Sequence, residues 1–229
     1  MASAEQASHF LTAEPLPDEA EARASFVLGL RRRGIGAHDV LSAIERVPRR
    51  LFLSARFHGL AYDDSNLPIE CGQVVAAPSH VAHVVQALSI AKKHRILEIG
   101  TGSGYQSAIL GHLAGRVDTV DRYQTLVSLA EQRIAALRLG NVFVHHNDGL
   151  SGLTQKAPFD RIILNGAVES ISEEILGQLA PEAILIAPIG AAGEPQDLVK
   201  LSRINGQITK VKIGVVRSVA LTAGKAQSL

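Results

Sequence analysis

The residues with the clearest chemical potential are three glycines at alternate positions, Gly100, Gly102 and Gly104. They follow an apolar run that predicts a buried strand ending at Ile99, and they precede a predicted helix that begins at Tyr105. Glycines at such a turn let a ligand approach the backbone at the carboxyl end of a strand. A dinucleotide-binding loop reads G-x-G-x-x-G, but Tyr105 occupies the position of its last glycine. The loop therefore favours a ligand other than a dinucleotide.

Acidic residues lie near the ends of three predicted strands. Glu98 stands two residues before Gly100, Asp121 follows the second strand, and Asp148 follows the third, beside Gly149. S-adenosylmethionine carries an ammonium and a sulfonium but no phosphate, so backbone donors with nearby carboxylates suit it. We expect Asp121 to accept from the ribose hydroxyls, Asp148 to accept from the adenine amino group, and Gly149 to allow close approach. The residues predicted to bind this cofactor are Glu98, Gly100, Thr101, Gly102, Ser103, Gly104, Asp121, Arg122, Asp148 and Gly149.

The sequence lacks the residues that base methylation, a cysteine nucleophile or a metal site would need. An enzyme that methylates a base nitrogen typically carries Asn or Asp before two prolines and an aromatic, whereas here Asn165 precedes Gly166 and Ala167. Cys71 is the only cysteine, has no activating base beside it, and is interpreted as a packing residue. The histidines show no ligand spacing with acids or cysteines, so no metal is expected.

An alternation of strands and helices positions these residues. It predicts an α/β fold with a doubly wound, mostly parallel, seven-stranded sheet of the Rossmann-like methyltransferase type, preceded by N-terminal helices. Asn205-Gly206 predicts an antiparallel C-terminal hairpin. The predicted strands are Arg95–Ile99, Arg116–Val120, Asn141–His145, Phe159–Leu164, Ala183–Ala187, Leu198–Arg203 and Gln207–Lys212, and the predicted core helices are Tyr105–Leu113, Leu126–Leu137 and Ser172–Leu179, with another beginning at Pro78.

The N-terminal third is less regular. Residues 1–18 are polar with two close prolines and are predicted to be a flexible leader. Helices are expected over 19–33 and 37–47, followed by a stretch, 49–77, that reads mostly as loop and is expected to contact substrate. We therefore expect one methyltransferase domain over 19–229, with the cofactor-binding core and C-terminal strands in 78–229.

Composition narrows the function classes. The 229 residues include 46% hydrophobic and 20% charged residues, and the formal net charge is +1. This charge does not favour capture of nucleic acid, and no apolar run is long enough for a membrane span. With one cysteine and no signal peptide, the chain is expected to be cytoplasmic, with neither a nucleic-acid nor a membrane partner.

Between about residue 22 and residue 223 the sequence resembles the protein-L-isoaspartate O-methyltransferase family. The resemblance implies transfer of a methyl group from S-adenosylmethionine to the free carboxylate of L-isoaspartyl residues in damaged proteins or peptides, by an enzyme expected to be a monomer. The resulting ester collapses to a succinimide, which allows repair. The segments that carry the resemblance are Arg46–Phe52, Ala61–Asp64, Leu67–Ile69, Gly72–Gln73, Leu97–Gln106, Asn147–Gly149 and Ala157–Asp160.

The departures from the family pattern fall at positions that face the substrate. Ala76 stands where the family has the serine whose hydroxyl is placed at the reacting carboxylate, and Ser218 and Ala220 replace a phenylalanine and a proline. Glu182 and Ala183 replace paired glycines before the fifth strand. By resemblance, the substrate-binding residues are Gln73, Val74, Val75, Ala76, Arg217, Val219 and Leu221.

These departures leave two alternatives beside a weakened isoaspartyl methyltransferase. One is a methyltransferase of the same fold that acts on another carboxylate, and the other is a catalytically silent protein that binds S-adenosylmethionine.

Overall fold

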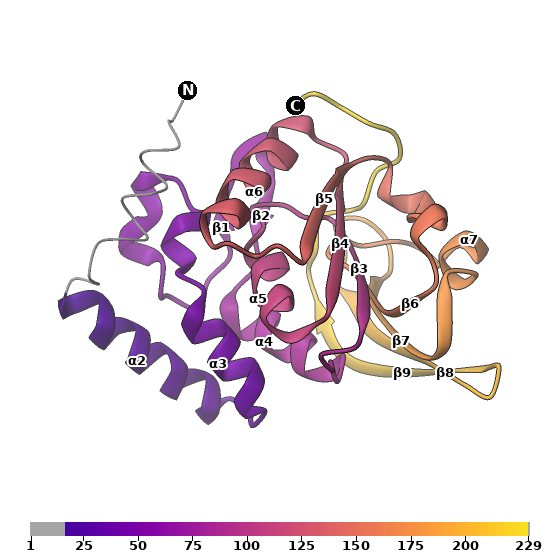
Figure 1. Ribbon diagram of the computed structural model, residues 1–229, viewed down its shortest axis with the longest axis horizontal. Coiled ribbons are helices and arrows are strands. Elements are labelled where there is room, and N and C mark those ends of the chain that lie inside the picture. The colour runs from indigo at the N-terminus through magenta and orange to yellow at the C-terminus, as the bar shows by residue number, and fades with distance from the viewer. Residues whose placement is uncertain (1–16, 229) are drawn as a thin grey trace.

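The computed structural model describes residues 17–228 and is built on a seven-stranded sheet in the order β5-β4-β3-β6-β7-β8-β9 (Figure 1). The first five strands along the chain run parallel, and β8 and β9 are antiparallel, as predicted. The strands are β3 (Arg95–Ile99), β4 (Arg116–Asp121), β5 (Val142–His146), β6 (Phe159–Leu164), β7 (Leu179–Ile189), β8 (Gln196–Ile204) and β9 (Gln207–Val216).

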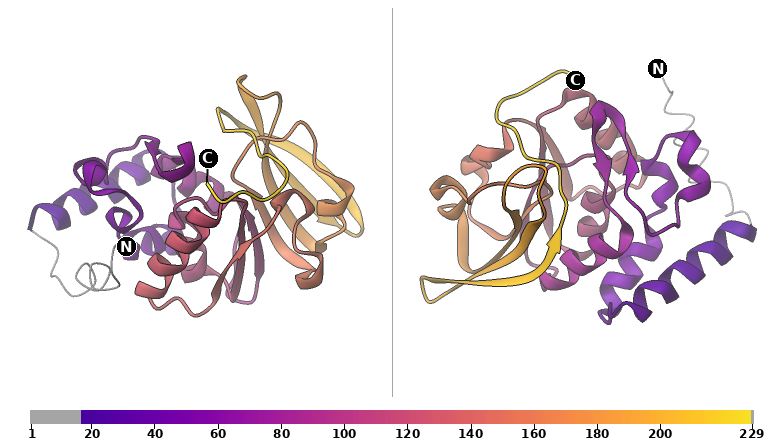
Figure 2. Two further views of the ribbon diagram at one scale, coloured as in Figure 1. Left: turned by 90° about the horizontal axis from the view of Figure 1, so that it is seen from above. Right: turned by 180° about the vertical axis from the view of Figure 1, so that it is seen from behind.

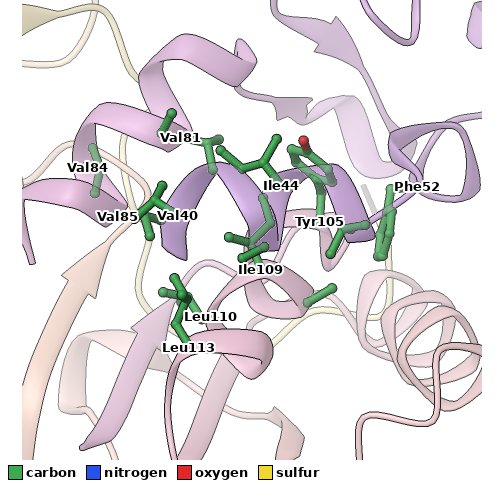
Figure 3. Close-up of a cluster of buried hydrophobic side chains, with 14 of the residues drawn as sticks. Val40, Ile44, Phe52, Val81, Val84, Val85, Tyr105, Ile109, Leu110 and Leu113 are labelled. Atoms are coloured by element: carbon green, nitrogen blue, oxygen red, sulfur yellow. The ribbon is translucent and has the colours of Figure 1, made fainter. Parts of the chain in front are cut away.

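Apolar side chains project from both faces of the central strands, so both faces of the sheet are buried, as is typical of parallel sheets. On one face, Ile96 and Ile163 pack in a cluster with the helices α3 (His38–Arg46), α4 (Pro78–Ala87) and α5 (Tyr105–Leu113). Figure 3 shows side chains of this cluster from the three helices, among them Ile44, Val84 and Ile109. Helix α6 (Gln124–Ala136) adds to the same cluster. On the other face, Leu97 and Ile162 pack with the short helix α7 (Glu173–Leu176). The sheet is therefore doubly wound (Figure 2).

The N-terminal helices pack on the α4 and α5 side of the sheet. Helix α2 spans Pro17–Arg32, so it begins two residues before the predicted start at residue 19; residues 1–16 lie outside the described residues. Helix α3 matches the prediction to within one residue at each end, because Ala37 caps its start and Val47 adopts an extended conformation before Pro48. Within residues 17–228, no helix is long and apolar enough to cross a membrane.

The stretch 49–77 is more ordered than the prediction of a loop. Its elements are three 3₁₀ helices and a two-stranded antiparallel sheet: η1 (Arg49–Phe52), η2 (Ala55–Leu60), β1 (Leu67–Pro68), η3 (Glu70–Gly72) and β2 (Val74–Val75). These pieces are too short to produce a periodic apolar pattern, which is why the sequence did not predict them. Arg49 organises the stretch, because its buried guanidinium donates to the carbonyls of Ala61, Asp63, Ser65 and Ala76.

The predicted helix over 172–179 is wrong in length. Ser172 caps its start by accepting from the amide of Ile175, but the helix ends at Leu176. The chain then turns at Gly177 and enters β7 at Leu179, four residues before the predicted strand. Pairing with β6 and β8 extends β7 beyond its apolar run, so tertiary contacts override the local pattern here. Two further 3₁₀ turns, η4 (Gly149–Ser151) and η5 (Thr154–Lys156), connect β5 to β6.

Candidate active site

A cavity of about 510 Å³ opens at the carboxyl ends of the parallel strands. At one end it is lined by the glycine loop, Asp121 and Gly149, and at the other by β2 and the start of α4. Ligands bind at this edge of open α/β sheets because the loops that follow the strands meet there. The structure thus brings most of the predicted cofactor residues and all of the predicted substrate residues around one continuous space.

The glycine loop adopts the backbone conformation that its sequence predicts. Gly100, Gly102 and Gly104 have φ values of 92°, 54° and 88°, in the left-handed region that favours glycine. Gly100 and Gly102 line the cavity. Gly104 does not line the cavity, and a Cβ there would lie 3.2 Å from the Cβ of Ala130 on α6. Its role is therefore the close packing of α5 against α6.

Asp121 lies at the end of β4 and lines the cavity with only 7% of its surface exposed. Its carboxylate accepts from the amide of Gly102 at 2.8 Å and from the amide of Tyr123 at 3.0 Å. Burial raises the pKa of this carboxyl, and the backbone hydrogen bonds act in the opposite direction. The neighbouring Arg122 also lines the cavity and donates from Nε to the carbonyl of Gly224. Asp121 thus joins the glycine loop to the turn after β4 and presents its carboxylate to the cavity.

Glu98 is fully buried beneath the loop and does not line the cavity. In β3 its side chain points to the face opposite that of Ile99, toward α5. One oxygen accepts from Gln106 and Asn165, both at 2.9 Å, and the other from Ser107 and Thr119. Burial is the dominant influence and raises the pKa of this carboxyl. Glu98 therefore orients Gln106 and Asn165, which do line the cavity.

Asp148 does not line the cavity itself, although the next two residues do. Its two oxygens accept from the backbone amides of Leu150 and Gly224, at 3.0 and 2.7 Å. It thus caps η4 and holds the C-terminal segment. Gly149 and Leu150 line the cavity instead, and a Cβ on Gly149 would lie 2.6 Å from Cγ2 of Ile99.

The second wall of the cavity, which we call the acceptor wall, consists of Gln73, Val74, Val75, Ala76 and His80. Two contacts hold its centre: the carbonyl of Ala76 accepts from Arg49 at 3.2 Å, and the amide of Ala77 donates to Asn66 Oδ1 at 2.7 Å. Pro78 then begins α4. The position of Ala76 is thus fixed, and its methyl group supplies no hydrogen bond.

The C-terminal segment, residues 217–228, completes the cavity. Arg217, Val219 and Leu221 line it, as do Gln73, Val74, Val75 and Ala76, so all the predicted substrate residues surround this space. The segment pairs with Ala167 and continues across the strand ends to the start of α6 (Figure 2). Hydrogen bonds between Gln124 N and Ala226 O, and between Ala226 N and Arg122 O, fix its end.

Several residues of the cavity were not predicted from the sequence. They include Asn66, His80, Tyr105, Gln106, Tyr123, Leu150 and Asn165. Tyr123 and Leu150 directly follow the predicted contacts Arg122 and Gly149, so their positions in the sequence could have predicted that they line the cavity. Nothing in the local pattern marks His80, because its approach to the cavity depends on how α4 packs. Within residues 17–228, no group of three or more His, Cys, Asp and Glu residues could hold a metal ion.

Comparison with known proteins identifies one family. The sequence model described as Protein-L-isoaspartate(D-aspartate) O-methyltransferase (PCMT) matches residues 21–226. A protein-L-isoaspartate O-methyltransferase from Azorhizobium caulinodans is 46% identical over 207 residues, which cover 90% of this chain and 95% of the relative. The enzyme of that name from Xanthobacter autotrophicus is 44% identical over 218 residues, which cover 95% and 99%.

Solved structures share the fold at lower sequence identity. A protein-L-isoaspartate O-methyltransferase structure superposes with a TM-score of 0.81 at 22% identity, covering 88% of this chain and 66% of the other. A structure from Plasmodium falciparum, described as such a methyltransferase in complex with S-adenosyl-L-homocysteine, has a TM-score of 0.76 at 23% identity and covers 86% and 97%. At these identities the likeness establishes the Rossmann-like methyltransferase fold.

Proposed function

The chain belongs to the protein-L-isoaspartate(D-aspartate) O-methyltransferase family, and we propose that it transfers a methyl group from S-adenosylmethionine to the free carboxylate of L-isoaspartyl residues in damaged proteins. The observation that carries this function is the single cavity, which joins the glycine loop and Asp121 to the acceptor wall. A donor bound at one end and a carboxylate at the other would meet within one cavity.

The residues at the glycine-loop end fit S-adenosylmethionine. Asp121 would accept from the ribose hydroxyls, because its carboxylate is oriented by two backbone amides and borders the cavity. We propose that Gly100, Thr101, Gly102, Ser103, Arg122 and Gly149 complete the cofactor contacts, since all of them line the same space. When bound, the cofactor supplies an electrophilic methyl group on a cationic sulfur.

The acceptor needs positioning more than activation. A carboxylate has a pKa near 4, so at pH 7 it is already the nucleophile and no general base is required. Val74, Val75 and Ala76 line the cavity with apolar groups, which would displace water from a bound carboxylate. Methyl transfer from a cationic sulfur to an anionic oxygen neutralises both charges, and an apolar cavity favours such a transition state over the separated charges. The chain therefore acts chiefly by alignment and desolvation.

Ala76 is expected to weaken this activity without abolishing it. A hydroxyl at this position would donate to the acceptor carboxylate, and a hydrogen bond to a charged group contributes about 1.5 to 3 kcal/mol. Its absence corresponds to a value of kcat/KM about ten- to a hundredfold lower. Ala76→Ser should therefore raise methylation while leaving cofactor affinity nearly unchanged.

The test is incubation of the full chain with labelled S-adenosylmethionine and an isoaspartyl peptide, beside the aspartyl peptide of the same sequence. Methylation of the isoaspartyl peptide alone supports the proposal. Calorimetry with S-adenosylhomocysteine is run in parallel. If cofactor binds but neither wild type nor Ala76→Ser methylates isoaspartyl peptides, the repair function is refuted; labelling of another carboxylate would then indicate a different acceptor, and no labelling a silent binder.

We also propose that the enzyme acts as a monomer in the cytoplasm, through a single domain over 19–229 and without nucleic acid. The cavity supports the monomer, since residues of one chain supply both of its ends. A net charge of +1 and a single cysteine support the compartment and the lack of a nucleic-acid partner.

A further inference from the structure

We propose that His80 positions the acceptor carboxylate, in the role that the family resemblance gives to a serine hydroxyl at position 76. This inference rests on the proposed function and names a residue that the sequence did not mark. His80 lies in the first turn of α4, four residues after Ala76, and both residues line the cavity on the acceptor wall.

A carboxylate that enters this part of the cavity needs a hydrogen-bond donor. It loses water against Val74, Val75 and Ala76, whose side chains cannot donate, and a buried charge without partners is strongly disfavoured. The acceptor wall must therefore contain another donor, or bind a carboxylate poorly.

Three other polar side chains around this end of the cavity each make a hydrogen bond within the protein. Asn66 Oδ1 accepts from the amide of Ala77, and Gln73 Nε2 donates to the carbonyl of Cys71 at 3.1 Å. Arg217 is exposed at the rim and donates to the carbonyl of Gly193, so water screens its charge. Among residues 17–228, the imidazole of His80 has no hydrogen-bond partner.

The environment of His80 suits a neutral donor. Burial lowers the pKa of its imidazole, and the nearby His83 lowers it further, so the ring is neutral at pH 7. A neutral imidazole keeps one N–H to donate. With one carboxylate oxygen held by this N–H, the other oxygen remains free to attack. The donor thus orients the acceptor without protonating it.

The expected effect of removing this donor on KM and kcat follows from the change in charge on the acceptor carboxylate during the reaction. The carboxylate loses its negative charge as the ester forms, so a donor stabilises the bound acceptor at least as well as the transition state. His80→Leu, which removes the donor and keeps an apolar side chain, should raise KM for an isoaspartyl peptide about ten- to a hundredfold, with kcat changed by less than about threefold. His80→Gln, which restores an N–H, should recover most of this loss.

His83→Leu is the matched control, because His83 lies on the same helix, is exposed and does not line the cavity. It should leave KM and kcat unchanged. Adding Ala76→Ser to His80→Leu should restore the acceptor KM, since the hydroxyl would replace the lost donor. A merely structural role of His80 would instead change thermal stability and affinity for S-adenosylhomocysteine, and Ala76→Ser would not repair those.

The experiment measures methylation kinetics, and also calorimetric binding of the isoaspartyl peptide to the complex with S-adenosylhomocysteine, for all these variants. If the wild type methylates isoaspartyl peptides and His80→Leu has the same peptide affinity and KM, the role of His80 is overturned and the proposed function stands. Wild-type protein that binds S-adenosylhomocysteine but neither binds nor methylates the peptide would refute the function and, with it, this inference.

Discussion

Replacing Glu98 tests whether its carboxylate contacts the cofactor or supports the floor of the cavity. In the structure, one oxygen accepts from two side-chain amides, those of Gln106 and Asn165, and the other from the hydroxyls of Ser107 and Thr119. In Glu98→Gln, the new carbonyl can keep both amide donors. The new NH₂ then faces the two hydroxyls, which can rotate to accept. We expect a loss of only about 1 kcal/mol in the free energy of unfolding.

Glu98→Leu should be far more damaging. The two hydroxyls can turn to other partners, since Thr119 Oγ1 lies 2.7 Å from Thr101 Oγ1 and 3.5 Å from Ser107 Oγ. One N–H of each amide would still lose its acceptor in a buried site. At 1 to 3 kcal/mol for each unsatisfied group, the loss is about 2 to 6 kcal/mol.

Denaturant unfolding and calorimetry with S-adenosylhomocysteine separate the two roles. A supporting carboxylate predicts that Glu98→Gln binds the product within about threefold of wild type, since Gln106 and Asn165 stay in place. Direct contact between the carboxylate and the ligand predicts a loss of about ten- to a hundredfold. A tenfold weaker affinity at nearly unchanged stability would therefore refute the supporting role.

Three further predictions follow from particular contacts. Asp121→Ala should weaken S-adenosylhomocysteine binding by about 1.5 to 3 kcal/mol, because the ribose would lose a charged acceptor; equal calorimetric affinities would make Asp121 purely structural. Glu182→Gly should raise the free energy of unfolding by about 1 kcal/mol, because Glu182 has a φ of 63°, which glycine adopts without strain. A lower midpoint of thermal unfolding would contradict this. Burial would raise the pKa of Asp118, but hydrogen bonds from His145 and Arg116 outweigh it and lower that pKa to about 2. This carboxylate therefore stabilises the fold at pH values above its ordinary pKa near 4, and the stabilisation is lost as the pH falls from about 4 to 2. Asp118→Asn should lower the free energy of unfolding by about 1 to 2 kcal/mol at pH 7 and by little at pH 2. A loss that does not change with pH in urea unfolding would count against this pairing.

The sequence by itself determined the sheet and the place of the site. Buried strands such as Arg95–Ile99 show as short, mostly apolar segments, and the glycine loop at Gly100 marks a strand-to-helix turn, because both depend on neighbours in the chain. Asn205-Gly206 fixed the C-terminal hairpin for the same reason, since a two-residue turn is a local structure.

Only the tertiary structure decided which side chains face the cavity. Glu98 and Asp148 are near the predicted site in sequence, yet strand pleating turns Glu98 toward α5, and the C-terminal segment occupies Asp148. His80 comes to the acceptor wall through the packing of α4, and residues 217–228 reach the strand ends through pairing with Ala167. Local sequence sets backbone conformation, but the direction of a side chain and the meeting of distant segments depend on long-range packing, which no spacing along the chain encodes.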